Sequence, residues 1–137
     1  MMRLALLIAL CLCLAACGGD DPTTTGGTTT QDGVDQGNPR ALAASVFAMA
    51  KSGNYAALEG IAAPSADGDC KRIAGVGKAE PDKQAEFAKY FSKGSVSGDA
   101  TIDGDKATVP ILFGPEGTKT ETFHMVRIDG KWFLESL

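Results

Sequence analysis

Histidine, tryptophan and cysteine are scarce in this sequence of 137 residues. It contains one histidine, His124, one tryptophan, Trp132, and four cysteines. With one histidine, the residue types support neither a His/Cys zinc cluster nor a Ser-His-Asp triad. We therefore expect no metal and no cofactor.

Positive charge is also in short supply. The chain has 13 Lys+Arg against 17 Asp+Glu, a net charge of −4. A nucleic-acid-binding domain needs a basic patch that neutralises phosphates, and this composition does not provide one. We expect no nucleic-acid partner.

The sequence has no apolar run long enough to span a bilayer, which takes roughly 20 residues. Residues 4–14, LALLIALCLCL, are eleven apolar residues that follow Arg3. A basic start and an apolar stretch of this length are typical of a signal peptide. Leu14-Ala15-Ala16-Cys17 follows and resembles the lipobox of bacterial lipoproteins.

This resemblance implies cleavage before Cys17 and attachment of acyl chains, such as palmitate, to that residue. The mature protein would then be anchored to a membrane of the cell envelope. Cleavage without lipid is the alternative. Gly18, where inner-membrane lipoproteins tend to carry Asp, favours the outer membrane if the host has two membranes. Cleavage removes Arg3, so 12 basic residues would face 17 acidic ones, a net charge of −5.

Cleavage and lipidation would leave Cys70 as the one free cysteine, which excludes a disulfide scaffold. We interpret it as a small shielded residue, with an intermolecular disulfide or a reactive thiol as alternatives. Residues 18–36, GGDDPTTTGGTTTQDGVDQ, contain too little apolar surface to fold. The predicted organisation is a signal peptide (1–16), a lipidated Cys17 with a flexible linker (17–37) and one domain (38–137).

The first half of that domain reads as helical. Asn38-Pro39 is a good helix start and Gly53 a good stop. A second short helix is expected over residues 55–61, with Leu58 and Ile61 inward, and a third over 81–93. Residues 64–78 are predicted as a loop, with room for a short strand near Ile73.

The second half alternates with a period of two and predicts an antiparallel meander. Turns fall at residues 103–105, 114–117 and at Asp129-Gly130, the strongest hairpin signal. Pro110 cannot donate to a ladder, so its strand is expected at an edge or bulged. A two-residue turn at Asp129-Gly130 sorts the apolar residues of the last hairpin onto two faces. One carries Phe123, Met125, Trp132 and Leu134, and the other Val126, Ile128, Phe133 and Leu137.

These elements predict an α+β domain, with N-terminal helices packed on a curved antiparallel sheet. The pattern resembles the nuclear transport factor 2-like, or cystatin-like, superfamily in three places: residues 52–58 (SGNYAAL), 104–109 (GDKATV) and 129–132 (DGKW). The resemblance covers residues 38–137. It implies a cone with an open pocket or a dimer surface, and some relatives are isomerases or dehydratases. Fold alone does not transfer function.

The candidate catalytic pair is His124 with Glu135, expected to face each other across the last hairpin. A carboxylate can orient an imidazole as a general base, while the simpler interpretation is a cross-strand pair in solvent. Arg127 should likewise pack on Trp132. Asp67-Gly68-Asp69 lacks the further ligands of a calcium loop, and residues 75–78 (GVGK) lack the spacing of a phosphate loop.

We therefore expect a non-enzymatic module that binds a protein partner or a small apolar ligand near the membrane, with a homodimer as one form of partner. The wall or interface residues expected are Trp132, Phe133, Met125 and Tyr90. The alternatives are a cone enzyme using His124 and Glu135, and a structural spacer. A ligand-binding cone would show a cavity of about 300 Å³ or more with polar groups converging on it.

Overall fold

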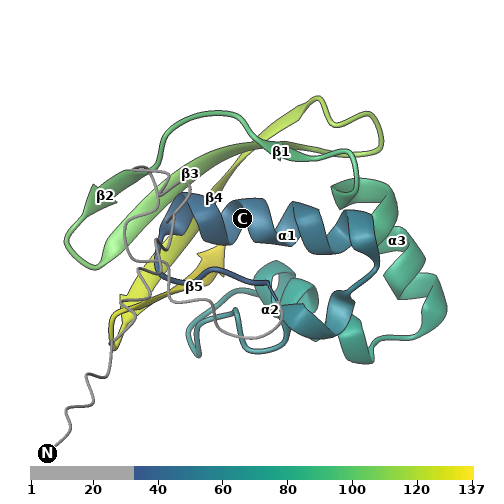
Figure 1. The fold of residues 1–137 in the computed structure, drawn as a ribbon, viewed down its shortest axis with the longest axis horizontal. Coiled ribbons are helices and arrows are strands. Elements are labelled where there is room, and N and C mark those ends of the chain that lie inside the picture. The colour runs from purple at the N-terminus through teal and green to yellow at the C-terminus, as the bar shows by residue number, and fades with distance from the viewer. Residues whose placement is uncertain (1–32) are drawn as a thin grey trace, which may run out of the picture.

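A computed structural model of the chain describes residues 33–137. The predicted signal peptide, Cys17 and most of the predicted linker lie outside these residues. Helices pack together on one face of a five-stranded antiparallel sheet, with α1 crossing the sheet and α3 at one end of the domain (Figure 1). The elements are α1 (Pro39–Ser52), η1 (Tyr55–Leu58), α2 (Gly68–Gly75), η2 (Val76–Lys78), α3 (Pro81–Phe91), β1 (Ser95–Val96), β2 (Thr101–Asp103), β3 (Lys106–Phe113), β4 (Lys119–Ile128) and β5 (Lys131–Ser136). The predicted α+β class is confirmed.

Helix α1 begins and ends where the sequence predicts. The Asn38 side chain accepts hydrogen bonds from the N–H groups of Arg40 and Ala41, at 2.8 and 3.2 Å. Gly53 closes the helix in the left-handed region, with φ 75°. Leu42 and Val46 are fully buried, so the apolar face of α1 forms one wall of the core.

The prediction of a loop over residues 64–78 is wrong, because these residues contain α2 and η2. The Asp67 carboxylate caps α2 by accepting from the N–H of Cys70 at 2.8 Å. Cys70 and Ile73 lie three residues apart on one face and are both buried. The strand expected near Ile73 is therefore also wrong.

The short second helix ends earlier than predicted, at Leu58, as a 3-10 turn. Gly60, with φ 82°, then turns the chain. Residues 61–63 run beside β5: the N–H of Ala63 donates to the carbonyl of Leu134, and the N–H of Leu134 to that of Ile61, both at 2.8 Å. Ile61 is buried as predicted.

The strand order is β1-β3-β4-β5, with β2 also paired to β3. The strand that contains Pro110, β3, therefore lies between other strands, so the prediction of an edge strand is wrong. On the side of β3 that pairs with β1 and β2, the gap between these two strands lies opposite Pro110. The Pro110 carbonyl points to this side and accepts from the N–H of Ser97 at 2.9 Å. A residue in an antiparallel strand directs both backbone groups to one side, so the missing donor of Pro110 faces this gap.

The hairpin of β4 and β5 turns at Asp129-Gly130, with φ 51° and 78°, as a two-residue turn with two left-handed residues. Ile128 pairs with Lys131, as predicted. The residues of the predicted inward face are all buried: Phe123, Met125, Trp132 and Leu134.

The folded region begins before Asn38, which corrects the predicted linker boundary at residue 37. Val34 is 1% exposed. Gln36 and Trp132 hydrogen-bond to each other: the Trp132 N–H donates to the Gln36 carbonyl at 2.8 Å, and Gln36 Nε2 to the Trp132 carbonyl at 3.0 Å. This segment therefore covers the outer edge of β5. Between residues 33 and 137, no helix has the length and hydropathy to cross a membrane.

Candidate ligand cavity

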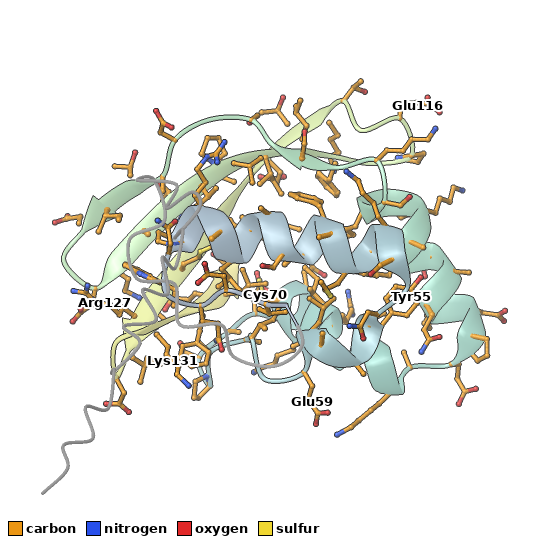
Figure 2. The ribbon with its side chains drawn as sticks, in the orientation of Figure 1. Tyr55, Glu59, Cys70, Glu116, Arg127 and Lys131 are labelled. Atoms are coloured by element: carbon orange, nitrogen blue, oxygen red, sulfur yellow. The ribbon has the colours of Figure 1, made fainter. Side chains whose placement is uncertain are left out.

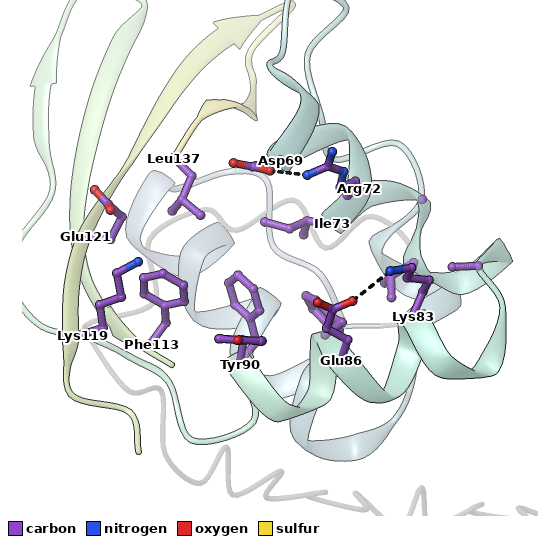
Figure 3. A pocket seen from close by; sticks show the side chains of 15 residues that line it. Asp69, Arg72, Ile73, Lys83, Glu86, Tyr90, Phe113, Lys119, Glu121 and Leu137 are labelled. Atoms are coloured by element: carbon purple, nitrogen blue, oxygen red, sulfur yellow. Dashed lines mark hydrogen bonds and ion pairs between the residues drawn. The ribbon is translucent and has the colours of Figure 1, made fainter. Parts of the chain in front are cut away.

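A cavity of about 950 Å³ lies between α2, α3 and the end of the sheet where β3 finishes and β4 begins (Figure 3). Its floor is apolar and its rim carries charged side chains. The floor is formed mainly by Ile73, Val76, Phe87, Phe91, Phe113 and Leu137. The volume exceeds the value of about 300 Å³ expected of a ligand-binding cone, whereas the polar groups that were expected to converge on the cavity lie at its rim.

Three phenylalanine rings form a row along the floor. The ring centroids of Phe113 and Phe91 are 5.5 Å apart, and those of Phe91 and Phe87 are 4.8 Å apart. Phe87 and Phe91 are four residues apart on α3 and therefore share one face of that helix. The three side chains are only 7–9% exposed. Their packing fixes the floor in place, because each ring is held by its aromatic neighbours.

Two of the cations on the rim already have carboxylate partners. Arg72 Nη1 lies 2.8 Å from Asp69 Oδ1 on α2, and Lys83 Nζ lies 3.2 Å from Glu86 Oε2 on α3. Both are exposed pairs three residues apart on one helix. Such pairs contribute little to stability, at most about 1 kcal/mol each.

Lys119 and Glu121 complete the rim from the sheet. Their register partners on β3, Phe113 and Ile111, are both buried. Directly opposite residues of an antiparallel pair share a face, so Lys119 and Glu121 lie on the inward face. Lys119 Nζ lies 4.9 Å from the centroid of the Phe113 ring, and Glu121 Oε1 accepts from the N–H of Thr122 at 3.3 Å.

Of the four predicted wall residues, Tyr90 lines the cavity and is 38% exposed. Trp132 and Met125 are 3% and 0% exposed and belong to the core. A side chain without accessible surface cannot contact a ligand directly, so we reassign both to the core. Phe133 is half-buried and pairs with Val126 on the opposite face of the sheet.

The predicted pairing of His124 with Glu135 is wrong. A β-bulge places His124 opposite Ser136 and Met125 opposite Leu134, which leaves Glu135 without a partner in the register. The Glu135 carboxylate instead accepts from Lys106 Nζ at 2.7 Å. His124 is exposed, and neither His124 nor Glu135 lines the cavity.

The same bulge corrects the position of Leu137, which was expected on the outer face with Val126, Ile128 and Phe133. One extra residue in β5 reverses the alternation that follows it. Leu137 therefore lines the cavity. Its N–H donates to Asp67 Oδ2 at 3.3 Å, which ties the end of β5 to the start of α2.

The predicted contact of Arg127 with Trp132 is confirmed. The two residues are register partners, and the guanidinium carbon of Arg127 lies 5.4 Å from the centroid of the Trp132 ring. Arg127 also pairs with Asp105 at 3.0 Å. Figure 2 shows Arg127 at the opposite end of the domain from Tyr55, so this contact holds the hairpin and does not belong to the cavity.

Cys70 is a shielded thiol, as predicted. It is fully buried in the interior of the domain (Figure 2). Burial, together with the nearby Asp67 carboxylate, raises the pKa of the Cys70 thiol to about 12. A thiol that stays protonated is a poor nucleophile, so Cys70 serves packing.

Asp67 acts as a helix cap. Partial burial raises its pKa, but hydrogen bonds from Cys70, Leu137 and Asp69 outweigh that effect and hold the pKa below its usual value. Residues 33–137 contain no group of three or more His, Cys, Asp or Glu side chains arranged to hold a metal ion.

Comparisons of the chain with protein-family models, with curated proteins and with solved structures find no match.

Proposed function

We propose that this chain is a lipid-anchored protein of the bacterial cell envelope whose domain binds a small, largely apolar molecule. The observation that carries the proposal is the cavity of about 950 Å³ with its row of phenylalanine rings and its charged rim. Pockets for small molecules typically have volumes of about 300–1,000 Å³, apolar walls and a few polar groups. A cavity with these properties supports binding of a molecule with an apolar body.

We propose binding rather than catalysis because the titratable groups around the cavity are mostly engaged. Arg72 forms an ion pair with Asp69, and Lys83 forms one with Glu86. Glu121 accepts a hydrogen bond. A general base must reach the proton that it abstracts. The earlier candidate, His124, is on an exposed part of β4 outside the cavity.

The finer fold assignment is also a proposal. We infer a cystatin-like cone, in which the sheet of β1–β5 wraps the helices and the cavity is the open end. Its support is the resemblance in the sequence together with the order of the elements, helices first and the antiparallel meander second.

The anchor is proposed from Leu14-Ala15-Ala16-Cys17. Two or more acyl chains hold a protein stably on a bilayer, at about 0.8 kcal/mol per buried methylene. Cells fed radiolabelled palmitate should label the native chain, and Cys17→Ser should abolish the label. Equal labelling of the two would contradict the anchor, and fractionation of the labelled protein would show whether it lies in the outer membrane.

Ligand binding is tested by narrowing the cavity. Ala79 lines it and is half-buried, so Ala79→Trp should occupy part of it and reduce the space for a ligand. Ala85 lies on an exposed part of α3 outside the cavity, so Ala85→Trp is the matched control. The probe is 4-phenylbutanamide, a neutral, water-soluble aromatic amide. Its binding to the mature lipoprotein in nanodiscs is measured by saturation-transfer NMR, and empty nanodiscs give the baseline.

The native protein and Ala85→Trp should show saturation transfer to the phenyl protons, and Ala79→Trp should show less. Circular dichroism establishes that both variants are folded. Equal transfer in all three proteins would place probe binding outside the cavity and refute the proposal.

A further inference from the structure

Lys119 differs from the other two cations of the cavity because it has no carboxylate partner. Arg72 and Lys83 are each neutralised by an acidic residue on their own helix, at 2.8 and 3.2 Å. No residue in the described range of 33–137 forms an ion pair with Lys119. The cavity rim therefore carries one cation that forms no ion pair with any of the described residues 33–137.

The position of Lys119 joins this charge to the apolar floor. Its Nζ lies 4.9 Å from the centroid of Phe113, which begins the row that continues through Phe91 to Phe87. In Figure 3 the Lys119 amine projects from β4 toward the cavity, beside Phe113. A molecule lying along the row would thus have its apolar body on the rings and one end at the ammonium group.

We propose that Lys119 makes this cavity selective for amphipathic carboxylates: molecules with an aromatic or aliphatic body and one terminal anionic group. This inference rests on the proposed function, since it names the ligand class of the same cavity. An ammonium group beside an apolar surface attracts an anion more strongly than it would in bulk water. The carboxylate would accept a charge-assisted hydrogen bond from Nζ.

Glu121 is the group that could favour the opposite charge. It lies two residues from Lys119 on the same face of β4, and it is half-buried. Its carboxylate already accepts from the N–H of Thr122 at 3.3 Å, whereas the Lys119 amine has only the face of an aromatic ring. A hydrogen bond from a neutral N–H leaves the Glu121 charge in place, but Lys119 is the more exposed of the two side chains, so the cation is the charge that a ligand at the rim meets.

The test uses three probes with one skeleton: 4-phenylbutyrate (anionic), 4-phenylbutanamide (neutral) and 4-phenylbutylamine (cationic). Each is titrated against the mature lipoprotein in nanodiscs by saturation-transfer NMR, with empty nanodiscs as the baseline. The variant is Lys119→Gln. Its control is Lys89→Gln, which removes the same charge from an exposed lysine of α3 outside the cavity.

The native protein and Lys89→Gln should bind the carboxylate about fivefold more tightly than the amide, the upper end for an exposed ion pair. Lys119→Gln should abolish this preference, so that this variant binds the carboxylate and the amide with equal affinity. Raising the NaCl concentration should reduce the preference in the native protein, because salt screens an exposed charge.

Equal affinities of the native protein for carboxylate and amide would overturn the inference and leave the proposed function standing. Tighter binding of the amine would also overturn it and assign the selection to Glu121. Retention of the preference in Lys119→Gln would show that another group recognises the anion. Failure of all three probes to bind the native protein would count against the proposed function itself.

Discussion

Phe91 joins the hydrophobic core to the cavity, and its removal gives the most direct test of this arrangement. Its ring centroid lies 6.0 Å from that of Phe47, 4.8 Å from Phe87 and 5.5 Å from Phe113. The side chain is 7% exposed, so Phe91→Ala removes almost a whole buried ring and three aromatic contacts. We expect a loss of about 3–5 kcal/mol in the free energy of unfolding.

The control is Phe133→Ala. Phe133 is half-buried on the opposite face of the sheet, so the same chemical change removes less buried surface. By area alone we expect a loss of roughly 1–2 kcal/mol. Domains of this size have total stabilities of about 5–15 kcal/mol. Phe91→Leu, which keeps part of the buried volume, therefore serves as the milder variant if Phe91→Ala does not fold.

Urea unfolding followed by tryptophan fluorescence measures both variants. Trp132 is the single tryptophan and is 3% exposed, so its emission reports exposure of the core. If Phe91→Ala costs no more than Phe133→Ala, the ring row is not a packed part of the core. A cavity floor held in place by packed aromatic rings would then be refuted. Phe91→Leu should also weaken binding of 4-phenylbutanamide, because the middle ring of the row is lost.

Three further predictions concern elements outside the cavity. Asn38→Ala should cost about 1 kcal/mol in urea unfolding, because the cap of α1 is lost. Gly117→Ala should cost more than Gly130→Ala: both glycines have a left-handed φ, 69° and 78°, but only at Gly117 would a Cβ lie 2.3 Å from the Lys93 carbonyl oxygen. Asp67→Asn should be less stable than the native protein at pH 7, by less than about 1 kcal/mol. The folded pKa of Asp67 lies below 3.8, so this contribution is present above that value and is lost as the pH falls further; urea unfolding at pH 7 and pH 3 should show a smaller gap at pH 3. A gap that grows on acidification would contradict that assignment.

The sequence predicted the elements whose signals are local. Helix α1 has both a capping residue and a terminating glycine, and the last hairpin has Asp129-Gly130 at its turn. Helix α2 was missed because glycine stands at both of its ends, Gly68 and Gly75, and glycine has a low helix propensity. Burial of Cys70 and Ile73 in the core stabilises α2, and such tertiary contacts cannot be read from a local pattern.

The candidate site was predicted only in part, and the β-bulge explains much of the difference. The one extra residue in β5 moves Glu135 away from His124 and turns Leu137 inward. Nothing in the sequence around residue 135 marks that irregularity. Trp132 was placed in the site because the last hairpin carries apolar residues on both of its faces, but its side chain belongs to the core.

One signal of the cavity was present in the sequence. Lys119, Glu121, Phe123 and Met125 alternate along β4 and occupy one face. Two charged residues stand on the same face of β4 as two core residues. The inward face is therefore accessible at the start of the strand and buried further along it. A charge is costly to bury without a partner, so the inward position of Lys119 and Glu121 predicts an opening at that end of the sheet.

The same residues explain why the cavity stays open. Strand β5 pairs with β4 only from His124 onward, so the part of β4 before it has no β5 neighbour. Covering that part with apolar side chains would bury Lys119 without a carboxylate partner, which is unfavourable. The cavity is thus a consequence of where β5 ends and of which residues β4 directs inward, and the proposals of ligand binding and of a preference for an anion are both based on that geometry.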